Sequence, residues 1–161
     1  MKIGFFGGGN MAEGILSAIE DKKNVIIAEK NPERAKALAK KYGVAVTGDV
    51  KEVAAKSDVV FLAVRPQDVD SVAVEVKSLL YAKQTLVSIV AGKTLAKLRT
   101  AFGRKVGMIR VMPNLALRVG AGMCAICPAS RTSKAHLSAV QSILGGVERH
   151  AVLFEKLAYL G

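Results

Sequence analysis

Short apolar runs alternate along the chain with segments of helical pattern. The runs are rich in Val, Ile, Leu and Phe, as strands are, and the segments between them have the composition and end signals of helices. The predicted strands span residues 2–6, 24–28, 44–46, 58–64, 85–90, 105–112, 122–127 and 148–153. The predicted helices span residues 10–19, 32–42, 49–57, 66–80, 94–101 and 133–144. This alternation favours an α/β fold with helices on both faces of a mainly parallel sheet.

Two details refine the predicted fold. Residues 58–64 are apolar almost throughout, which is expected of a strand in the middle of a parallel sheet. The run at 122–127 is expected to be antiparallel at the edge of the sheet, with a further strand after it. The fold class is therefore predicted to be a doubly wound, Rossmann-type sheet with extra strands near its C-terminal edge.

Length and composition indicate one folded domain. The chain has 161 residues, of which 51% are hydrophobic, and this is enough to bury a sizeable core. We expect a dinucleotide-binding domain at 1–153 and, at 154–161, the beginning of a helix that has nothing left to pack against. Glycines and Glu13 interrupt the first apolar run too early for a signal peptide, and no run is long enough to span a bilayer. A cytoplasmic protein without membrane contacts is expected.

The chain is strongly basic, with a net charge of +11. Such a charge is compatible with nucleic acid, an anionic substrate or an anionic cofactor. The basic residues are scattered, and neither an arginine-rich arm nor an aromatic RNA-binding signature accompanies them. A solvated basic surface is therefore favoured over nucleic-acid binding, which stays as an alternative.

Metal binding is not expected. Cys124 and Cys127 form a single C-x-x-C in a predicted strand, where residues three apart point to opposite faces. His136 and His150 lack the spacing of metal ligands. We expect two buried, reduced thiols.

The strongest motif lies at the end of the first strand. Gly7, Gly9 and Ala12 fit the pattern G-x-G-x-x-A between a predicted strand and a predicted helix. In this context the first glycine permits a tight turn, the second lets a pyrophosphate approach the backbone, and the alanine allows close packing of helix on strand. Free N–H groups at the helix start then face the phosphates.

The choice between NAD and NADP stays open. Glu29 ends the second strand, 22 residues after Gly7, where an acidic side chain can accept from both ribose hydroxyls of NAD and repel a 2′-phosphate. Lys30 and Arg34 follow closely, and either could pair with that phosphate.

The segments that follow two later strands are candidate ligand-binding segments. "AVRP" at 63–66 and "SIVAG" at 88–92 follow predicted strands, and ligands of doubly wound sheets lie beyond the carboxyl ends of the strands. Together with "RVMPN" at 110–114 and the glycine loop, these motifs resemble the pyrroline-5-carboxylate reductases in order and spacing, from about residue 1 to residue 154.

The resemblance implies a reductase that uses NAD(P)H to reduce L-1-pyrroline-5-carboxylate to L-proline, a small-molecule substrate. The candidate cofactor-binding residues are Phe6, Gly7, Gly8, Gly9, Asn10, Met11, Glu29, Lys30, Arg34, Ala63, Val64, Arg65, Pro66, Ser88 and Ala91. The resemblance places Met112, Pro113 and Asn114 around the nicotinamide. No catalytic acid, base or nucleophile is identified, because hydride addition to a protonated imine needs alignment more than a strong base.

The sequence departs from the family pattern at several positions. Arg65 stands for a lysine, Val50 for an asparagine facing the adenosine ribose, and Leu115 and Ala116 for a threonine and a proline. In the family, the region matching 154–161 leads into a helical domain that forms the dimer and much of the pocket for the substrate carboxylate. We therefore expect homo-oligomers through that domain and little or no activity from this chain alone. The alternatives are a non-catalytic dinucleotide-sensing paralogue and a reductase of another cyclic imine.

Overall fold

The computed structural model describes residues 1–112, 122–145 and 148–152. Its strands are β1 (Ile3–Phe6), β2 (Val25–Ala28), β3 (Ala45–Thr47), β4 (Val59–Leu62), β5 (Thr85–Ser88), β6 (Gly107–Met112), β7 (Gly122–Pro128) and β8 (Glu148–Val152). Its α-helices are α1 (Asn10–Ala18), α2 (Pro32–Tyr42), α3 (Val50–Lys56), α4 (Val69–Val76), α5 (Leu95–Phe102) and α6 (Lys134–Gly145). Short 3-10 helices occupy Lys22–Asn24 and Pro66–Asp68.

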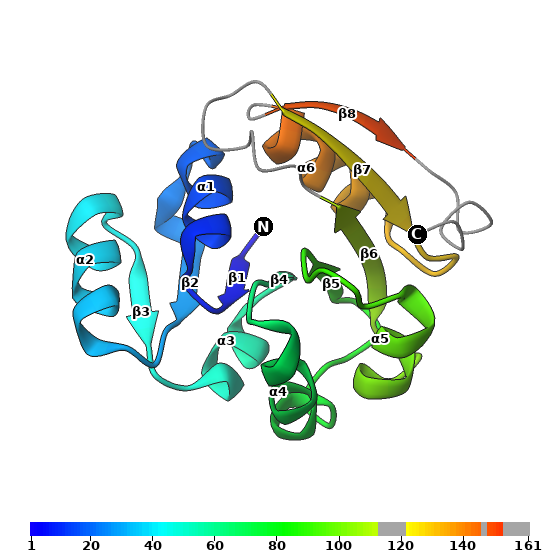
Figure 1. Ribbon diagram of the computed structural model, residues 1–161, viewed down its shortest axis with the longest axis horizontal. Coiled ribbons are helices and arrows are strands. Elements are labelled where there is room, and N and C mark those ends of the chain that lie inside the picture. The colour runs from blue at the N-terminus through cyan, green and yellow to red at the C-terminus, as the bar shows by residue number, and fades with distance from the viewer. Residues whose placement is uncertain (113–121, 146–147, 153–161) are drawn as a thin grey trace.

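The strands of this described part form a single sheet in the order β3-β2-β1-β4-β5-β6-β7-β8 (Figure 1). The first six are parallel, β7 runs antiparallel to β6, and β8 lies parallel to β7. The order turns outward in both directions from the pair β1 and β4, which is the doubly wound arrangement. The predicted fold class is confirmed, including the antiparallel strand and the added strand at the C-terminal edge.

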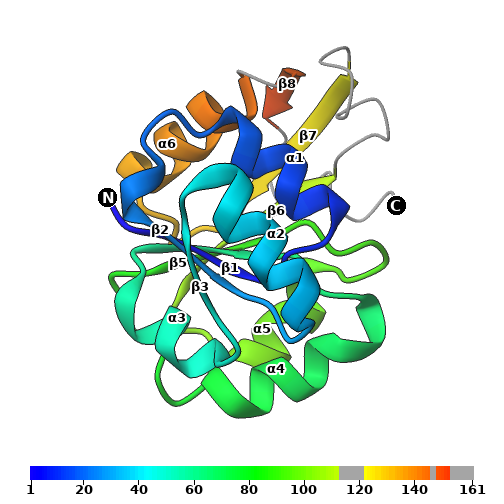
Figure 2. The ribbon, with the colours of Figure 1, turned by 90° about the vertical axis from the view of Figure 1, so that its left-hand side faces the viewer.

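Helices cover both faces of the sheet. Buried residues of α1, α2 and α6 pack with Phe5, Ile27 and Phe61 on one face. Buried residues of α3, α4 and α5 pack with Leu62 and Leu86 on the other. Figure 2 shows these two helical layers on either side of the strands. Because successive side chains of a strand alternate between faces, apolar runs such as Val59–Leu62 fill both cores at once.

The ends of α2 follow the expected cap chemistry. The Asn31 side chain accepts hydrogen bonds from the backbone N–H groups of Glu33 and Arg34, and Pro32 is the first helical residue. Gly43 ends the helix with φ of +66°, a left-handed conformation that glycine adopts without strain.

The predicted ends of the other elements differ from the observed ends by a few residues. The largest difference is at 66–80, where the chain makes a 3-10 turn after Pro66 and α4 ends at Val76.

The two cysteines occupy opposite faces, as predicted. Cys124 belongs to the core under α1 and α6, and Cys127 belongs to the core on the other face. Both side chains are buried, and neither forms a disulfide bond among the described residues. Among the described residues, no group of His, Cys, Asp and Glu side chains has the arrangement of a metal site. Within this same part of the chain, no helix is both long enough and apolar enough to cross a bilayer.

Candidate functional site

The link between β1 and α1 is a turn that requires glycine at its first position. Gly7 has φ of +96°, and its N–H donates to the carbonyl of Ala28, 2.9 Å away. A Cβ atom on Gly7 would lie 2.7 Å from the carbonyl oxygen of Ala63. Both the backbone conformation and the contact with the end of β4 therefore exclude a side chain here.

The next two glycines differ from each other. A Cβ atom on Gly8 would meet Leu38 at 2.6 Å and the Glu29 carboxylate at 3.0 Å, so Gly8 is closely packed. A Cβ atom on Gly9 would meet nothing within 4 Å. Gly9 has φ of −70° and ψ of −173°, which any residue adopts. The backbone at Gly9 thus borders open space, as a loop that another molecule approaches closely must do.

The start of α1 is uncapped. Gly9 is the N-cap residue and provides no side-chain acceptor, and the first helical hydrogen bond is donated by Glu13 to the Gly9 carbonyl at 2.9 Å. The N–H groups at positions 10–12 therefore have no acceptor in the helix. Such groups, with the positive end of the helix dipole, attract an anion.

Glu29 closes the far side of the loop. One carboxylate oxygen accepts from the Gly8 N–H at 3.0 Å, and the other accepts from the Asn31 N–H at 2.8 Å. The second strand thereby presents a fixed negative charge beside the glycines. This is the position from which an acidic side chain can bind the ribose hydroxyls of NAD.

A groove joins these elements at the carboxyl edge of the sheet. It has a volume of about 580 Å³. Of the predicted residues it includes Gly7, Gly8, Gly9, Glu29, Lys30, Ala63, Val64 and Arg65. Val50, which stands where the family has an asparagine facing the adenosine ribose, also lines the groove. The other lining residues were not predicted, and they are Ala28, Asn31, Gly48, Asp68, Ser71 and Val72. Gly48 follows the end of β3, and Asp68, Ser71 and Val72 lie at the start of α4, so the rule that ligands lie beyond strand ends could have found these four.

The structure places the other predicted residues next to the groove or away from it. Phe6 and Ser88 are buried in the sheet, and the Ser88 hydroxyl accepts from the Val90 N–H at 3.3 Å. Asn10 and Ala91 are exposed, Met11 is half-buried and packs on the core, Pro66 begins the 3-10 turn, and Met112 ends β6. Pro113 and Asn114, like Leu115 and Ala116, lie outside the described residues.

Arg34 is held by protein groups rather than directed into the groove. Its Nε donates to the Gly8 carbonyl at 2.8 Å, and its terminal nitrogen pairs with Glu13 at 2.5 Å. Glu13 also accepts from Lys41 at 2.8 Å and from the Tyr42 hydroxyl at 2.9 Å. This cluster ties α1 and α2 to the glycine loop. A 2′-phosphate would have to compete with Glu13 for Arg34.

The Glu13 cluster makes the stability depend on pH. Hydrogen bonds from Lys41, and then from Arg34 and Tyr42, lower the pKa of Glu13 from 4.5 to about 2, although burial acts in the opposite direction. The folded state therefore binds fewer protons than the unfolded chain between these values. The contribution of Glu13 is complete above about pH 5 and is lost as pH falls toward 2.

Replacing Glu13 by glutamine should lower the free energy of unfolding at pH 7 by about 1–2 kcal/mol, a value that allows for solvent screening of the exposed partners. The difference from wild type should shrink as pH falls from 5 toward 3, and urea unfolding across this range measures it. Glu20→Gln is the control, since Glu20 is exposed and has no ion pair among the described residues. A constant difference at all pH values would contradict the role of the Glu13 charge.

Arg110, the first residue of the motif "RVMPN", is a buried cation to which the motif assigned no role. It is 7% exposed, and its Nε has no hydrogen-bond partner in the described part of the protein. It pairs in register with Ser88 of β5, two residues before the end of β6. A lone basic residue in an apolar strand is the sequence signal that marks it.

Comparison with known proteins assigns the chain to a protein family. The model of the family described as "NADP oxidoreductase coenzyme F420-dependent" matches residues 2–92, which is more than half of the chain. The chain belongs to this family. The matched region contains β1 to β5 and therefore the whole groove.

The relatives narrow the assignment. Pyrroline-5-carboxylate reductase of Aquifex aeolicus is 34% identical over 147 residues, which are 89% of this chain and 54% of that protein. The Escherichia coli enzyme of the same name is 36% identical over 132 residues, 79% of this chain and 49% of that protein. The chain spans about half the length of the curated relatives it matches. The resemblance inferred from the motifs is confirmed.

Solved structures agree with the sequence relatives. A pyrroline-5-carboxylate reductase from Coxiella burnetii has a TM-score of 0.90 at 27% identity, over 94% of this chain and 58% of that one. A pyrroline carboxylate reductase from Plasmodium falciparum, solved with NADP bound, has a TM-score of 0.82 at 25% identity, over 97% and 58%. These similarities support the use of NAD(P).

Proposed function

We propose that the groove binds NAD(P)H and that the protein carrying this chain reduces L-1-pyrroline-5-carboxylate to L-proline. The observation that carries the proposal is the glycine loop at the carboxyl edge of the sheet, with open space at Gly9 and an uncapped helix behind it. The names of the relatives supply the reaction.

The residues present fit a dinucleotide. The N–H groups at the start of α1 would bind the pyrophosphate, and Glu29 would accept from the adenosine ribose. Val64 and Val72 give the groove an apolar wall beside Ala63. Arg65, whose Nε is 2.8 Å from Asp68, is exposed at the rim, where its charge is partly neutralised.

The contribution of the protein to the chemistry is positional. The bound nicotinamide would supply a hydride to the C=N carbon of a cyclic imine. Ser88 and Met112, at the ends of β5 and β6, and Pro113 and Asn114 after them, are proposed to lie around the reacting ring. Holding donor and acceptor in line removes much of the entropic barrier, and because the imine nitrogen of the substrate already carries its proton, hydride addition gives the amine directly and no strong general base is required.

The partners follow from the same proposal. The substrate is a small molecule, and we propose that the protein binds neither nucleic acid nor a membrane. Because the relatives are about twice as long as the matched region, the rest of the substrate pocket and a homo-oligomer interface are proposed to lie in a helical domain of the complete protein. A cytoplasmic location is proposed with it.

The test has two parts. The chain should bind NADH or NADPH with saturable fluorescence enhancement and a raised melting temperature. If millimolar concentrations of both leave the melting curve unmoved, the cofactor site is refuted.

The complete protein should then consume NAD(P)H when pyrroline-5-carboxylate is added and form proline in equal amount. Cofactor binding without proline formation would refute the substrate. A dinucleotide-sensing protein would turn over no imine, and a reductase of another cyclic imine would consume cofactor with that imine instead.

A further inference from the structure

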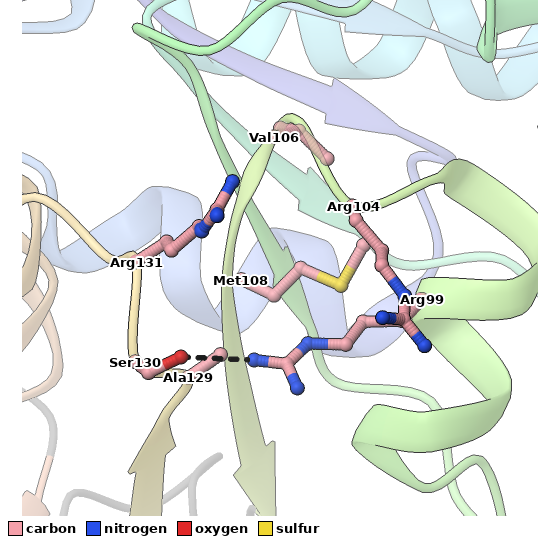
Figure 3. Close-up of a pocket in the computed structure, with 7 residues that line it drawn as sticks. All are labelled: Arg99, Arg104, Val106, Met108, Ala129, Ser130 and Arg131. Atoms are coloured by element: carbon pink, nitrogen blue, oxygen red, sulfur yellow. Dashed lines mark hydrogen bonds between the residues drawn. The ribbon is translucent and has the colours of Figure 1, made fainter.

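A second pocket lies near the amino ends of the parallel strands, whereas the glycine loop lies at their carboxyl ends. It has a volume of about 250 Å³ and is placed at the first residues of β6, whereas the glycine loop follows the last residue of β1 (Figure 3). It is lined by Arg99, Arg104, Val106, Met108, Ala129, Ser130 and Arg131, and we call it the arginine pocket. Nothing in the proposed reductase activity uses it.

Two parts of the chain that are distant in sequence contribute the arginines. Arg99 lies on α5, Arg104 on the link from α5 to β6, and Arg131 on the link from β7 to α6. Figure 3 shows Arg99 and Arg104 beside the sulfur atom of Met108 and Arg131 on the other side of β6. A terminal nitrogen of Arg99 donates to the Ser130 hydroxyl at 3.5 Å, across the pocket. The convergence is a property of the fold, because no local sequence motif produces it.

The walls of the pocket are fixed by backbone contacts. The Ala129 N–H and the Thr132 hydroxyl both donate to the Met108 carbonyl, at 2.8 and 2.7 Å. Gly103, with φ of +89°, turns the chain after α5. The floor consists of Val106, Met108 and Ala129, all of them buried. The arginines thus surround a preformed hollow with an apolar base.

The charge of the pocket is not compensated by nearby sequence. Residues 76–147 contain eleven Lys and Arg and no Asp or Glu, so this segment alone accounts for the net charge of +11. In the rest of the chain, acidic and basic residues balance. Among the ion pairs of the described residues, none includes Arg104 or Arg131. The basic residues are scattered along the whole sequence, but the excess of basic over acidic residues lies in the segment that holds this pocket.

We propose that the arginine pocket binds a compact multivalent oxyanion, such as a small organic phosphate or polycarboxylate, at a site separate from the dinucleotide groove. Guanidinium groups bind phosphate and carboxylate through paired hydrogen bonds, and the Ser130 hydroxyl adds another polar contact. The volume suits a small molecule, and the apolar floor suits its carbon skeleton. An extended polyanion would instead follow a long basic groove.

The test is calorimetric titration of the chain with inorganic pyrophosphate and with citrate, at 150 mM salt. A Gly9→Val variant, whose glycine loop is obstructed, should lose only the binding that the wild-type glycine loop adds and retain the saturable binding of both anions to the arginine pocket. Arg104→Gln combined with Arg131→Gln should weaken it at least tenfold. Lys23→Gln combined with Lys40→Gln removes the same charge from exposed positions elsewhere and should leave it within twofold.

Three outcomes would overturn the proposal. Loss of binding only in Gly9→Val would place the anion on the glycine loop. Equal weakening in both double variants would indicate a general effect of net charge. Tighter binding of a 20-nucleotide duplex than of pyrophosphate, reduced alike in both double variants, would indicate a non-specific polyanion surface. Because both arginines are exposed, unchanged melting temperatures are expected and would show that the variants are folded.

Discussion

Replacing Gly9 by valine should abolish the binding of NADH and NADPH while the protein stays folded. The backbone at Gly9 has a conformation open to any residue, and a Cβ atom there meets no protein atom within 4 Å. The added side chain would therefore stand in the groove, beside the N–H groups that are proposed to bind the pyrophosphate. We expect a loss of at least about 100-fold in affinity, or roughly 3 kcal/mol of binding free energy.

Gly7 provides the matched comparison. Gly7→Ala places a Cβ atom 2.7 Å from the Ala63 carbonyl at a φ of +96°, so it should destabilise the fold itself by about 2 kcal/mol or more. Gly9→Val should change the free energy of unfolding far less, and Gly9→Ala should weaken binding by an intermediate amount. Fluorescence titration and urea unfolding separate the two effects. Wild-type affinity in Gly9→Val would refute the groove as the pyrophosphate site.

The contrast between the two glycines could not be obtained from the sequence. The motif assigned a turn to Gly7 and close approach to Gly9. It could not show that Gly8 is packed against Leu38, or that Gly9 alone among the three loop glycines borders free space. Those facts depend on β4 and α2, which lie far from the loop in sequence. The sheet was predictable because its apolar runs and caps are local signals, such as Asn31 and Gly43 around α2.

Long-range polar contacts were the part that sequence reasoning could not supply. Arg34 was a candidate for a 2′-phosphate because it stands just after Glu29 in the chain. Its actual partners, Glu13 and the Gly8 carbonyl, are 21 and 26 residues away. The arginine pocket has the same origin, since Arg99 and Arg131 line one pocket because β7 pairs antiparallel with β6. The sequence shows which residues are basic, but it does not show which of them line the same pocket.

If Glu29 lies at the adenosine ribose as proposed, the wild-type chain is expected to bind NADH at least about tenfold more tightly than NADPH. The Gly8 and Asn31 N–H groups fix its carboxylate, and two like charges about 4 Å apart cost on the order of 4 kcal/mol at an effective dielectric of 20. Arg34 offsets little of this, because Glu13 already binds it.

Glu29→Ala should therefore weaken NADH binding and narrow or reverse the preference, shifting the ratio of the two dissociation constants at least tenfold toward NADPH. Glu29→Gln keeps the size of the side chain and one of the two accepted hydrogen bonds while it removes the charge, so it tests the repulsion with less disturbance of the loop than Glu29→Ala. Glu33→Ala, which removes an exposed acid at the start of α2 outside the groove, should leave the ratio unchanged. Fluorescence titration of both cofactors at one salt concentration measures the ratio. An equal loss of NADH and NADPH in Glu29→Ala would mean that Glu29 supports the shape of the loop and does not select the cofactor.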